Sequence, residues 1–250
     1  MGDFEHIQYQ VAGGLATVCL NRPDKLNALN GKMAEELYEI VKAIGDDPEI
    51  KVFLIKGQGR AFSAGVDLKE TSAESFSSDG GIIDIGFRLS KILESMNKVT
   101  IAQIHGHCYT GALELALMFD MIFCSHDTQF ADTHAKWGIM PRWGMTQRLS
   151  RRVGINKAKE LTFRALKFDG KEAASLGLAN ASYPENQLDQ QVQTVIKDIL
   201  ENSQEAIAAI KMLYNQGWAT TLKEGLALEQ STDPKLLDTS DLIDQFDQRK

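Results

Sequence analysis

The sequence predicts an α/β fold, because segments with the composition of strands alternate with segments of helical periodicity. Two apolar, strand-like runs each lead into a turn that contains glycine, and the last third of the chain carries mostly amphipathic helical patterns. With 250 residues, 43% of them hydrophobic, the chain is long enough to bury one large core. We expect that core over residues 1–195 and a helical oligomerisation region over residues 196–250.

The alternation is clearest in the first half of the chain. Residues 15–20 alternate and are β-branched, which is typical of a strand, and further strands are expected at 51–56, 99–104 and 121–124. A helix is expected over about residues 85–96. Another helix follows the first strand, since apolar residues recur there at helical spacing: Met33, Leu37, Ile40, Val41 and Ile44.

The chain is mostly helical in pattern from residue 156 onward, with helices expected at 187–200, 204–216 and 222–229. Amphipathic helices need a surface to cover, and another copy of the chain serves as well as the parent core, so oligomerisation is favoured. Residues 70–81 are rich in Thr, Ser, Asp and Gly, which predicts a loop beside the first glycine turn that could cover a ligand.

Charge and composition exclude several classes of partner. The formal net charge is −7, and Lys and Arg are dispersed along the chain, so we expect no nucleic-acid partner. Apolar runs shorter than about 10 residues predict no membrane span. The three cysteines, Cys19, Cys108 and Cys124, lack C-x-x-C spacing, so we expect no disulfide and a cytoplasmic protein.

The two glycine turns predict the chemistry. They read R-A-F-S-A-G-V-D over residues 60–67 and H-G-H-C-Y-T-G-A-L-E over residues 105–114. Each follows an apolar strand-like run and precedes a segment of helical composition, so we expect one backbone N–H from each turn at a strand-to-helix corner. Two such N–H groups directed at one carbonyl oxygen would stabilise the enolate of a thioester.

Four motifs in order resemble those of the enoyl-CoA hydratase/isomerase, or crotonase, superfamily: L-N-R-P-D-K-L-N-A-L-N at 20–30, A-F-S-A-G-V-D-L-K-E at 61–70, G-A-L-E-L-A-L-M-F-D at 111–120 and P-x-x-G-x-T-Q-R-L at 141–149. The resemblance covers nearly the whole chain. It implies a spiral of ββα repeats with a C-terminal helical trimerisation region, assembled as a homotrimer or homohexamer. It also implies an acyl-CoA substrate and no cofactor beyond the coenzyme A that the substrate carries.

The resemblance further assigns an oxyanion hole to the backbone N–H groups of Val66 and Gly111. The family usually has three glycines at the second turn, where this chain reads Thr110-Gly111-Ala112 and keeps only the middle one. Glu114 stands one helical turn later, at the position of the glutamate that activates water in hydratases. Its apolar flanks favour a catalytic carboxylate over a solvated one.

The second hydratase carboxylate is replaced by His134 in this chain. An imidazolium there could protonate C2 of the substrate, since a nearby carboxylate raises the pKa of a histidine; alternatively, His134 fills the pocket wall, or Asp132 substitutes as the acid. Arg142 occupies the place of a catalytic Asp in dienoyl-CoA isomerases, naphthoyl-CoA synthases and aryl-CoA dehalogenases, so those branches are disfavoured.

Binding residues are assigned on the same resemblance. Arg60 and Lys69 correspond to basic residues near the coenzyme A phosphates, although each could equally be a solvated surface charge. The backbone around Ala64 resembles the bend that contacts adenine. His105-x-His107 offers two imidazoles on one side of an extended segment, but no third ligand lies at a convincing spacing, so we expect no metal.

Trp137, Trp143 and Met145 either shape the acyl pocket or pack in the core. The function these residues predict is hydration of a trans-2-enoyl-CoA to a 3-hydroxyacyl-CoA, with Glu114 as base and His134 as acid. A double-bond isomerase and a non-catalytic acyl-CoA-binding protein are the alternatives. Thioester hydrolysis through Glu114 and water also stays open.

Overall fold

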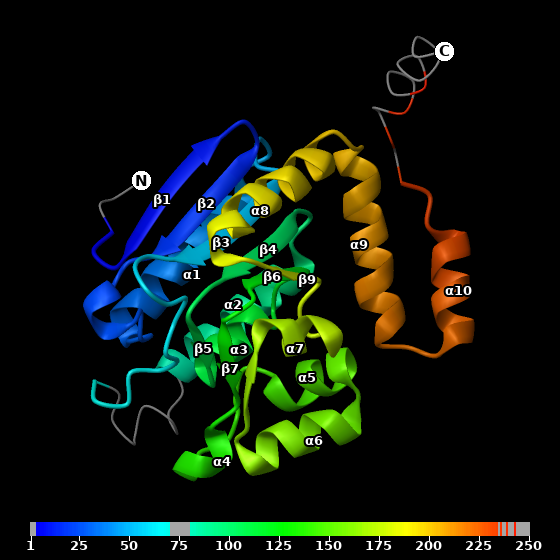
Figure 1. Cartoon of the computed structure of the whole chain (residues 1–250). Helices are drawn as coiled ribbons and strands as arrows, with labels where there is room; N and C mark the ends of the chain where they lie inside the picture. The colour runs from blue at the N-terminus through cyan, green and yellow to red at the C-terminus, as the bar shows by residue number, and fades with distance from the viewer. Residues whose placement is uncertain (1–3, 71–80, 235, 237–238, 240–242, 244–250) are drawn as a thin grey trace.

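The computed structural model describes residues 4–70, 81–234, 236, 239 and 243, and they form two sheets surrounded by helices (Figure 1). The larger sheet has six strands in the order β1-β2-β3-β4-β6-β9, and the smaller has three in the order β5-β7-β8. Among the strand pairs of the described residues, only β1/β2 and β7/β8 are antiparallel. The strands are β1 Ile7–Ala12, β2 Leu15–Leu20, β3 Val52–Gly57, β4 Val99–Ile104, β5 His107–Tyr109, β6 Met121–Ser125, β7 Gln129–Ala131, β8 Lys167–Asp169 and β9 Ala181–Tyr183.

The predicted alternation of strands and helices is confirmed, and β2 and β4 have the predicted bounds. The structure adds β1 and four strands of three residues each, β5, β7, β8 and β9, which are too short to show a periodicity. The α-helices are α1 Gly31–Asp46, α2 Ile82–Ser95, α3 Gly111–Ala116, α4 His134–Trp137, α5 Met145–Val153, α6 Ile155–Arg164, α7 Gly170–Ser175, α8 Glu185–Leu200, α9 Gln204–Trp218 and α10 Leu222–Ser231.

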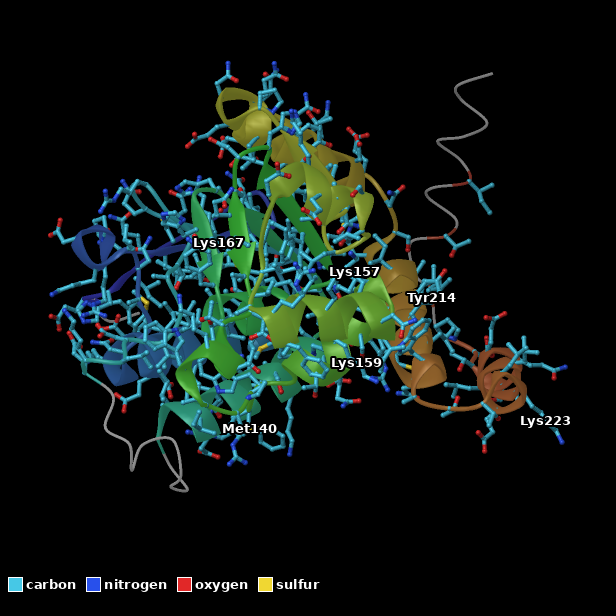
Figure 2. The ribbon with its side chains drawn as sticks, turned by 60° about the horizontal axis from the view of Figure 1, so that its bottom comes forward. Met140, Lys157, Lys159, Lys167, Tyr214 and Lys223 are labelled. Atoms are coloured by element: carbon cyan, nitrogen blue, oxygen red, sulfur yellow. The ribbon has the colours of Figure 1, made fainter. Side chains whose placement is uncertain are left out.

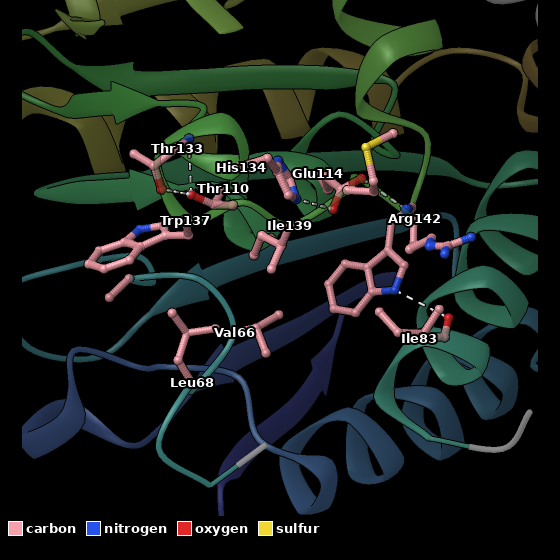
Figure 3. A pocket seen from close by; sticks show the side chains of 14 residues that line it. Val66, Leu68, Ile83, Thr110, Glu114, Thr133, His134, Trp137, Ile139 and Arg142 are labelled. Carbon is pink, nitrogen blue, oxygen red and sulfur yellow. Dashed lines mark hydrogen bonds and ion pairs between the residues drawn. The ribbon is translucent and has the colours of Figure 1, made fainter. Parts of the chain in front are cut away.

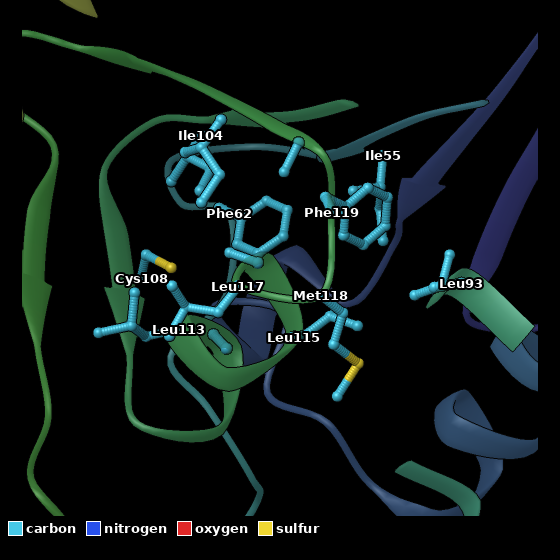
Figure 4. Close-up of a cluster of buried hydrophobic side chains, with 14 of the residues drawn as sticks. Ile55, Phe62, Leu93, Ile104, Cys108, Leu113, Leu115, Leu117, Met118 and Phe119 are labelled. Carbon is cyan, nitrogen blue, oxygen red and sulfur yellow. The ribbon is translucent and has the colours of Figure 1, made fainter. Parts of the chain in front are cut away.

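The central strands are buried on both faces, which explains their continuous apolar composition. In β3, Phe53 and Ile55 face the main core, while Val52 and Leu54 face the second cluster under α8. Figure 4 shows Ile55 beside Phe119, with the leucines of α3 gathered nearby. Because α3 sits inside this core, the residues that it presents to a site are held firmly.

Helix α1 begins after Asn30, whose side chain accepts the Met33 N–H at 2.9 Å. The apolar stripe predicted for this helix is buried throughout. The stripe packs into the main core, and α1 lies against α2. The two helices therefore pack as a pair against the same core.

The C-terminal helices differ from the rest in burial. Helix α8 covers one face of the large sheet with Leu188, Val192 and Ile196. Helices α9 and α10 pack on each other and extend beyond the sheets, and neither has a buried residue (Figure 1). Tyr214 on α9 and Lys223 on α10 lie on this projecting part (Figure 2). The proposed division between residues 195 and 196 falls inside α8 and stays a prediction.

Three further expectations concern single features. Cys19, Cys108 and Cys124 are buried free thiols. The predicted covering loop lies almost wholly outside the described residues, since 71–80 are not among them. In the part of the chain that the structure describes, no helix is long and apolar enough to cross a membrane.

Candidate functional site

The two glycine turns lie against each other although 37 residues, 68–104, separate them in the chain. The Phe62 N–H donates to the His105 carbonyl at 2.8 Å, and the Ser63 N–H donates to the His107 carbonyl at 2.9 Å. Gly65 has a φ of +96°, and a Cβ there would lie 2.6 Å from the Tyr109 carbonyl oxygen. Only glycine permits both this conformation and this close approach.

The approach places both Val66 and Gly111 in the lining of one pocket, in which Figure 3 labels Val66, Glu114 and His134. A Cβ on Gly111 would lie 3.3 Å from the Val66 nitrogen. Val66 forms an isolated β-bridge with Leu29: the Leu29 N–H donates to the Gly65 carbonyl, and the Leu29 carbonyl accepts the Asp67 N–H. The Val66 N–H therefore points away from Leu29. Among the described residues, neither the Val66 nor the Gly111 N–H has a protein acceptor.

Gly111 is the first residue of α3, as a strand-to-helix corner requires, although the three-residue strand β5 comes between β4 and this helix. For Val66 the same prediction is wrong. Val66 lies in an isolated bridge with Leu29 and does not begin a helix. Its N–H is therefore oriented by β-type pairing, without a helix dipole behind it.

Glu114, in the first turn of α3, is only 4% exposed. Its Oε1 accepts the backbone N–H groups of Trp143 at 2.8 Å and Met145 at 3.2 Å. Gly144, between these donors, has a φ of +97°, a conformation that favours glycine and turns both N–H groups toward the same oxygen. One carboxylate oxygen is thus fixed by the backbone, and the other, Oε2, faces His134.

His134 contacts two carboxylates, one on α3 and one two residues before it in the chain. Its Nε2 is 3.4 Å from Oε2 of Glu114, and its Nδ1 is 2.6 Å from Oδ1 of Asp132. The other Asp132 oxygen accepts the Thr162 hydroxyl of α6 at 2.7 Å. All three ionisable side chains are buried, with Asp132 at 0% exposure. With Thr162 they form a row in the order Glu114, His134, Asp132, Thr162, joined by one ion-pair contact and two hydrogen bonds.

This row changes the protonation of its members. Burial lowers the pKa of His134, but hydrogen bonds to Asp132 and Glu114 outweigh burial and raise that pKa to about 9. Burial also opposes the charge of Asp132, yet the hydrogen bonds from His134 and Thr162 bring the pKa of Asp132 below its ordinary value. At neutral pH the site therefore holds an imidazolium beside an ionised Asp132.

Apart from Glu114, His134, Arg142 and two threonines, the pocket lining is apolar, and its volume is about 520 Å³ including solvent at its mouth. Its apolar walls come from the first glycine turn and the residue after it, from α2, from the end of α4 and from the segment that follows α4: Val66, Leu68, Ile83, Trp137, Ile139, Met140 and Trp143. Trp137 is 58% exposed, whereas Trp143 is 4% exposed and also lines a smaller apolar cavity behind the pocket. Met145 is buried in the core. An apolar pocket of this kind suits an acyl chain.

Trp143 is positioned by a glycine on α2. A Cβ on Gly86 would lie 2.1 Å from two indole atoms, so Gly86→Ala forces the ring to move and should destabilise the protein by about 1–3 kcal/mol. Gly45→Ala in α1 is the matched control, because its Cβ would meet neighbours only at 3.7 Å and beyond, and it should stabilise by about 0.5–1 kcal/mol. Urea unfolding measures both. Equal effects of the two substitutions would contradict the packing of Trp143 against Gly86.

The binding residues assigned by resemblance are not all brought together. Ala64 lines the pocket, whereas Arg60 and Lys69 are exposed and lie outside its described lining. Their roles stay predictions. Arg142 lines the pocket, a place that its sequence position, which only disfavours other branches of the family, does not indicate. Within the described residues, no group of three or more His, Cys, Asp and Glu side chains could hold a metal ion.

Two features exceed what the sequence indicated. Thr110, at the place of a usual glycine, has a φ of +51°, and its N–H donates to the Ala131 carbonyl at 2.8 Å. Its hydroxyl oxygen accepts the Thr133 N–H at 3.2 Å, so neighbouring backbone holds this strained residue. The sequence suggests Asp132 only as a substitute acid, but Asp132 contacts His134 and does not line the pocket. The only sequence signal was its spacing of two residues from His134.

Comparison with known proteins identifies the family. The family model for enoyl-CoA hydratase/isomerase matches residues 10–244. The chain is 34% identical over 219 residues to the probable enoyl-CoA hydratase 1, peroxisomal, of Arabidopsis thaliana, covering 88% of this chain and 82% of the relative. It is 30% identical over 227 residues to the crotonyl-CoA hydratase of Syntrophomonas wolfei, covering 90% of this chain and 87% of that protein.

A solved structure shows the same fold. The putative enoyl-CoA hydratase of Thermobifida fusca, determined in complex with acetoacetyl-CoA, superposes with a TM-score of 0.82 at 27% identity, over 90% of this chain and 92% of that one. The predicted crotonase-like α/β fold is thereby confirmed. The chain belongs to the enoyl-CoA hydratase/isomerase family, within the crotonase superfamily.

Proposed function

We propose that the protein hydrates a trans-2-enoyl-CoA to a 3-hydroxyacyl-CoA. The observation that carries the proposal is the convergence of two unpartnered N–H groups, those of Val66 and Gly111, on an apolar pocket that also holds Glu114 and His134. Donors preorganised in a site that excludes water stabilise charge that develops on a thioester oxygen. The names of the two curated relatives, both hydratases, support the same reaction.

The row of ionisable groups balances the protons of this reaction. Glu114 takes a proton from water as the water oxygen attacks C3, and the electrons of the double bond move to the thioester oxygen between the two amides. His134 then gives its Nε2 proton to C2 as the enolate collapses. Glu114 holds one extra proton and His134 lacks one, and the 3.4 Å contact between Oε2 and Nε2 lets that proton return.

Labelled water tests the reaction. Crotonyl-CoA incubated with the purified protein in water labelled with heavy oxygen should gain the label at C3, and the reaction in deuterium oxide should place deuterium at C2. Mass spectrometry of the product thioester measures both. Deuterium exchange without heavy oxygen, on a 3-enoyl substrate, would indicate the isomerase, and no incorporation would indicate a non-catalytic acyl-CoA-binding protein.

The remaining parts of the proposal concern coenzyme A, assembly and compartment. Arg60, Lys69 and the backbone at Ala64 would hold the coenzyme A part of the substrate, and no other cofactor takes part in the cycle.

Helices α9 and α10 expose large apolar side chains, including Tyr214 at 75% and Leu222 at 79%, which supports a homotrimer or homohexamer formed through residues 196–250. Light scattering measures the number of chains. Three buried free thiols support a cytoplasmic location.

A further inference from the structure

We propose that Asp132 is a positioning residue that fixes the orientation and the charge of His134, so that His134 serves as the proton donor and Glu114 remains the base. The proposal rests on the proposed hydration. Asp132 touches neither the pocket nor the oxyanion amides, and it acts only through the imidazole. This arrangement replaces a second carboxylic acid by a histidine that a buried carboxylate keeps charged.

The first step is orientation. Oδ1 of Asp132 accepts from both the Nδ1 and the backbone N–H of His134, at 2.6 and 3.2 Å, so ring and backbone are held by one oxygen. Oδ2 accepts the Thr162 hydroxyl, which fixes the carboxylate itself from α6. With Nδ1 committed to Asp132, the nitrogen left for the substrate is Nε2, the one that faces Glu114.

The second step is charge. The titratable groups that face the ring are the carboxyl groups of Asp132, from the segment after β7, and Glu114, from α3, and Arg142 lines the same pocket. A histidine 5% exposed would otherwise lose its proton readily, because burial disfavours the charged form. Asp132 is the closer of the two carboxylates and the one with no role in taking a proton from water. It keeps the acid charged while Glu114 changes its charge during the cycle.

The sign of the pH dependence follows. His134 is the active acid when protonated, so activity should be retained below the folded-state pKa of about 9 and lost as the pH rises through it. Asp132→Asn keeps an oxygen acceptor for Nδ1 but removes the charge. The basic limb of the kcat profile should therefore move to lower pH by about 1–3 units. KM should stay unchanged, since Asp132 does not line the pocket.

Two measurements decide the proposal. The first is the pH profile of kcat. Asp132→Asn should not change this profile in a protein that already carries His134→Ala, because Asp132 acts only through the His134 imidazole. The second is the NMR titration of His134, assigned by the signal missing in His134→Ala, whose midpoint should fall by the same 1–3 units in Asp132→Asn. Thr162→Val should move both readouts in the same direction by less.

Asp120→Asn is the matched control, since the Asp120 carboxylate is also held by hydrogen bonds, from Thr100 and Lys211, away from the pocket. It should leave the His134 titration in place. If Asp132→Asn and Thr162→Val both leave the titration midpoint and the basic limb where they are in the parent, Asp132 has only a structural role and the proposal is overturned. The NMR titration of His134 does not depend on turnover. If the protein fails to hydrate crotonyl-CoA, the proposed function is wrong, and the titration still shows whether Asp132 controls the protonation of His134.

Discussion

Glu114→Gln should lower kcat for crotonyl-CoA hydration by about 100- to 10,000-fold, the usual contribution of a general base. The amide keeps an oxygen for the Trp143 and Met145 N–H groups, so the local backbone stays in place. What is lost is the charged Oε2 that takes the proton of water and faces the His134 imidazole. Steady-state kinetics measures the loss, and KM should change far less than kcat because the pocket keeps its shape.

A second buried carboxylate supplies the control for that substitution. Glu36 is 5% exposed and, like Glu114, accepts two backbone N–H groups, those of Glu5 at 3.0 Å and His6 at 2.9 Å. Glu36→Gln should leave kcat at the parent value. If Glu114→Gln turns over as fast as Glu36→Gln, Glu114 is not the base, and the proton of water must go to another group.

The sequence predicted the larger elements because their patterns are long enough to read. The apolar stripe of α1 and the β-branched run of β2 each extend over several residues, and both appear where expected. The second sheet was missed because β5, β7 and β8 have three residues each and are held by partners distant in the chain. Their pairing is a consequence of the fold, so no local periodicity could predict it.

The residues that line the site were predictable from the sequence, whereas the hydrogen bonds that link them to residues behind the pocket were not. Val66, Gly111, Glu114 and His134 all line the pocket, and the resemblance had named each of them. The link from His134 through Asp132 to Thr162 was not predictable, because Thr162 is 30 residues from Asp132 and meets it only when α6 packs beside α4. The helix corner expected at Val66 failed for a related reason: a single bridge to Leu29, invisible in the local pattern, orients that amide.

Gly111→Ala tests the geometry on which the proposed chemistry depends. The added Cβ would lie 3.3 Å from the Val66 nitrogen and 2.8 Å from Val66 Cγ2, so the methyl group covers the amide that should receive the thioester oxygen. Loss of one oxyanion donor lowers kcat by about 100- to 1,000-fold. We expect a loss of that size in crotonyl-CoA hydration, measured by steady-state kinetics, with the His134 titration unchanged.

A second substitution distinguishes the two effects of Gly111→Ala, which are steric strain against Val66 and blockage of the Val66 amide. Val66→Ala combined with Gly111→Ala removes the 2.8 Å contact with Cγ2 and should restore the free energy of unfolding, but the methyl group still covers the Val66 nitrogen, so the rate should stay low. Gly31→Ala, also at the first residue of a helix, adds a Cβ that meets nothing within 4 Å and should leave the rate unchanged. If the double variant recovers the parent rate, the loss came from distorted packing, and the thioester oxygen does not bind between these two amides.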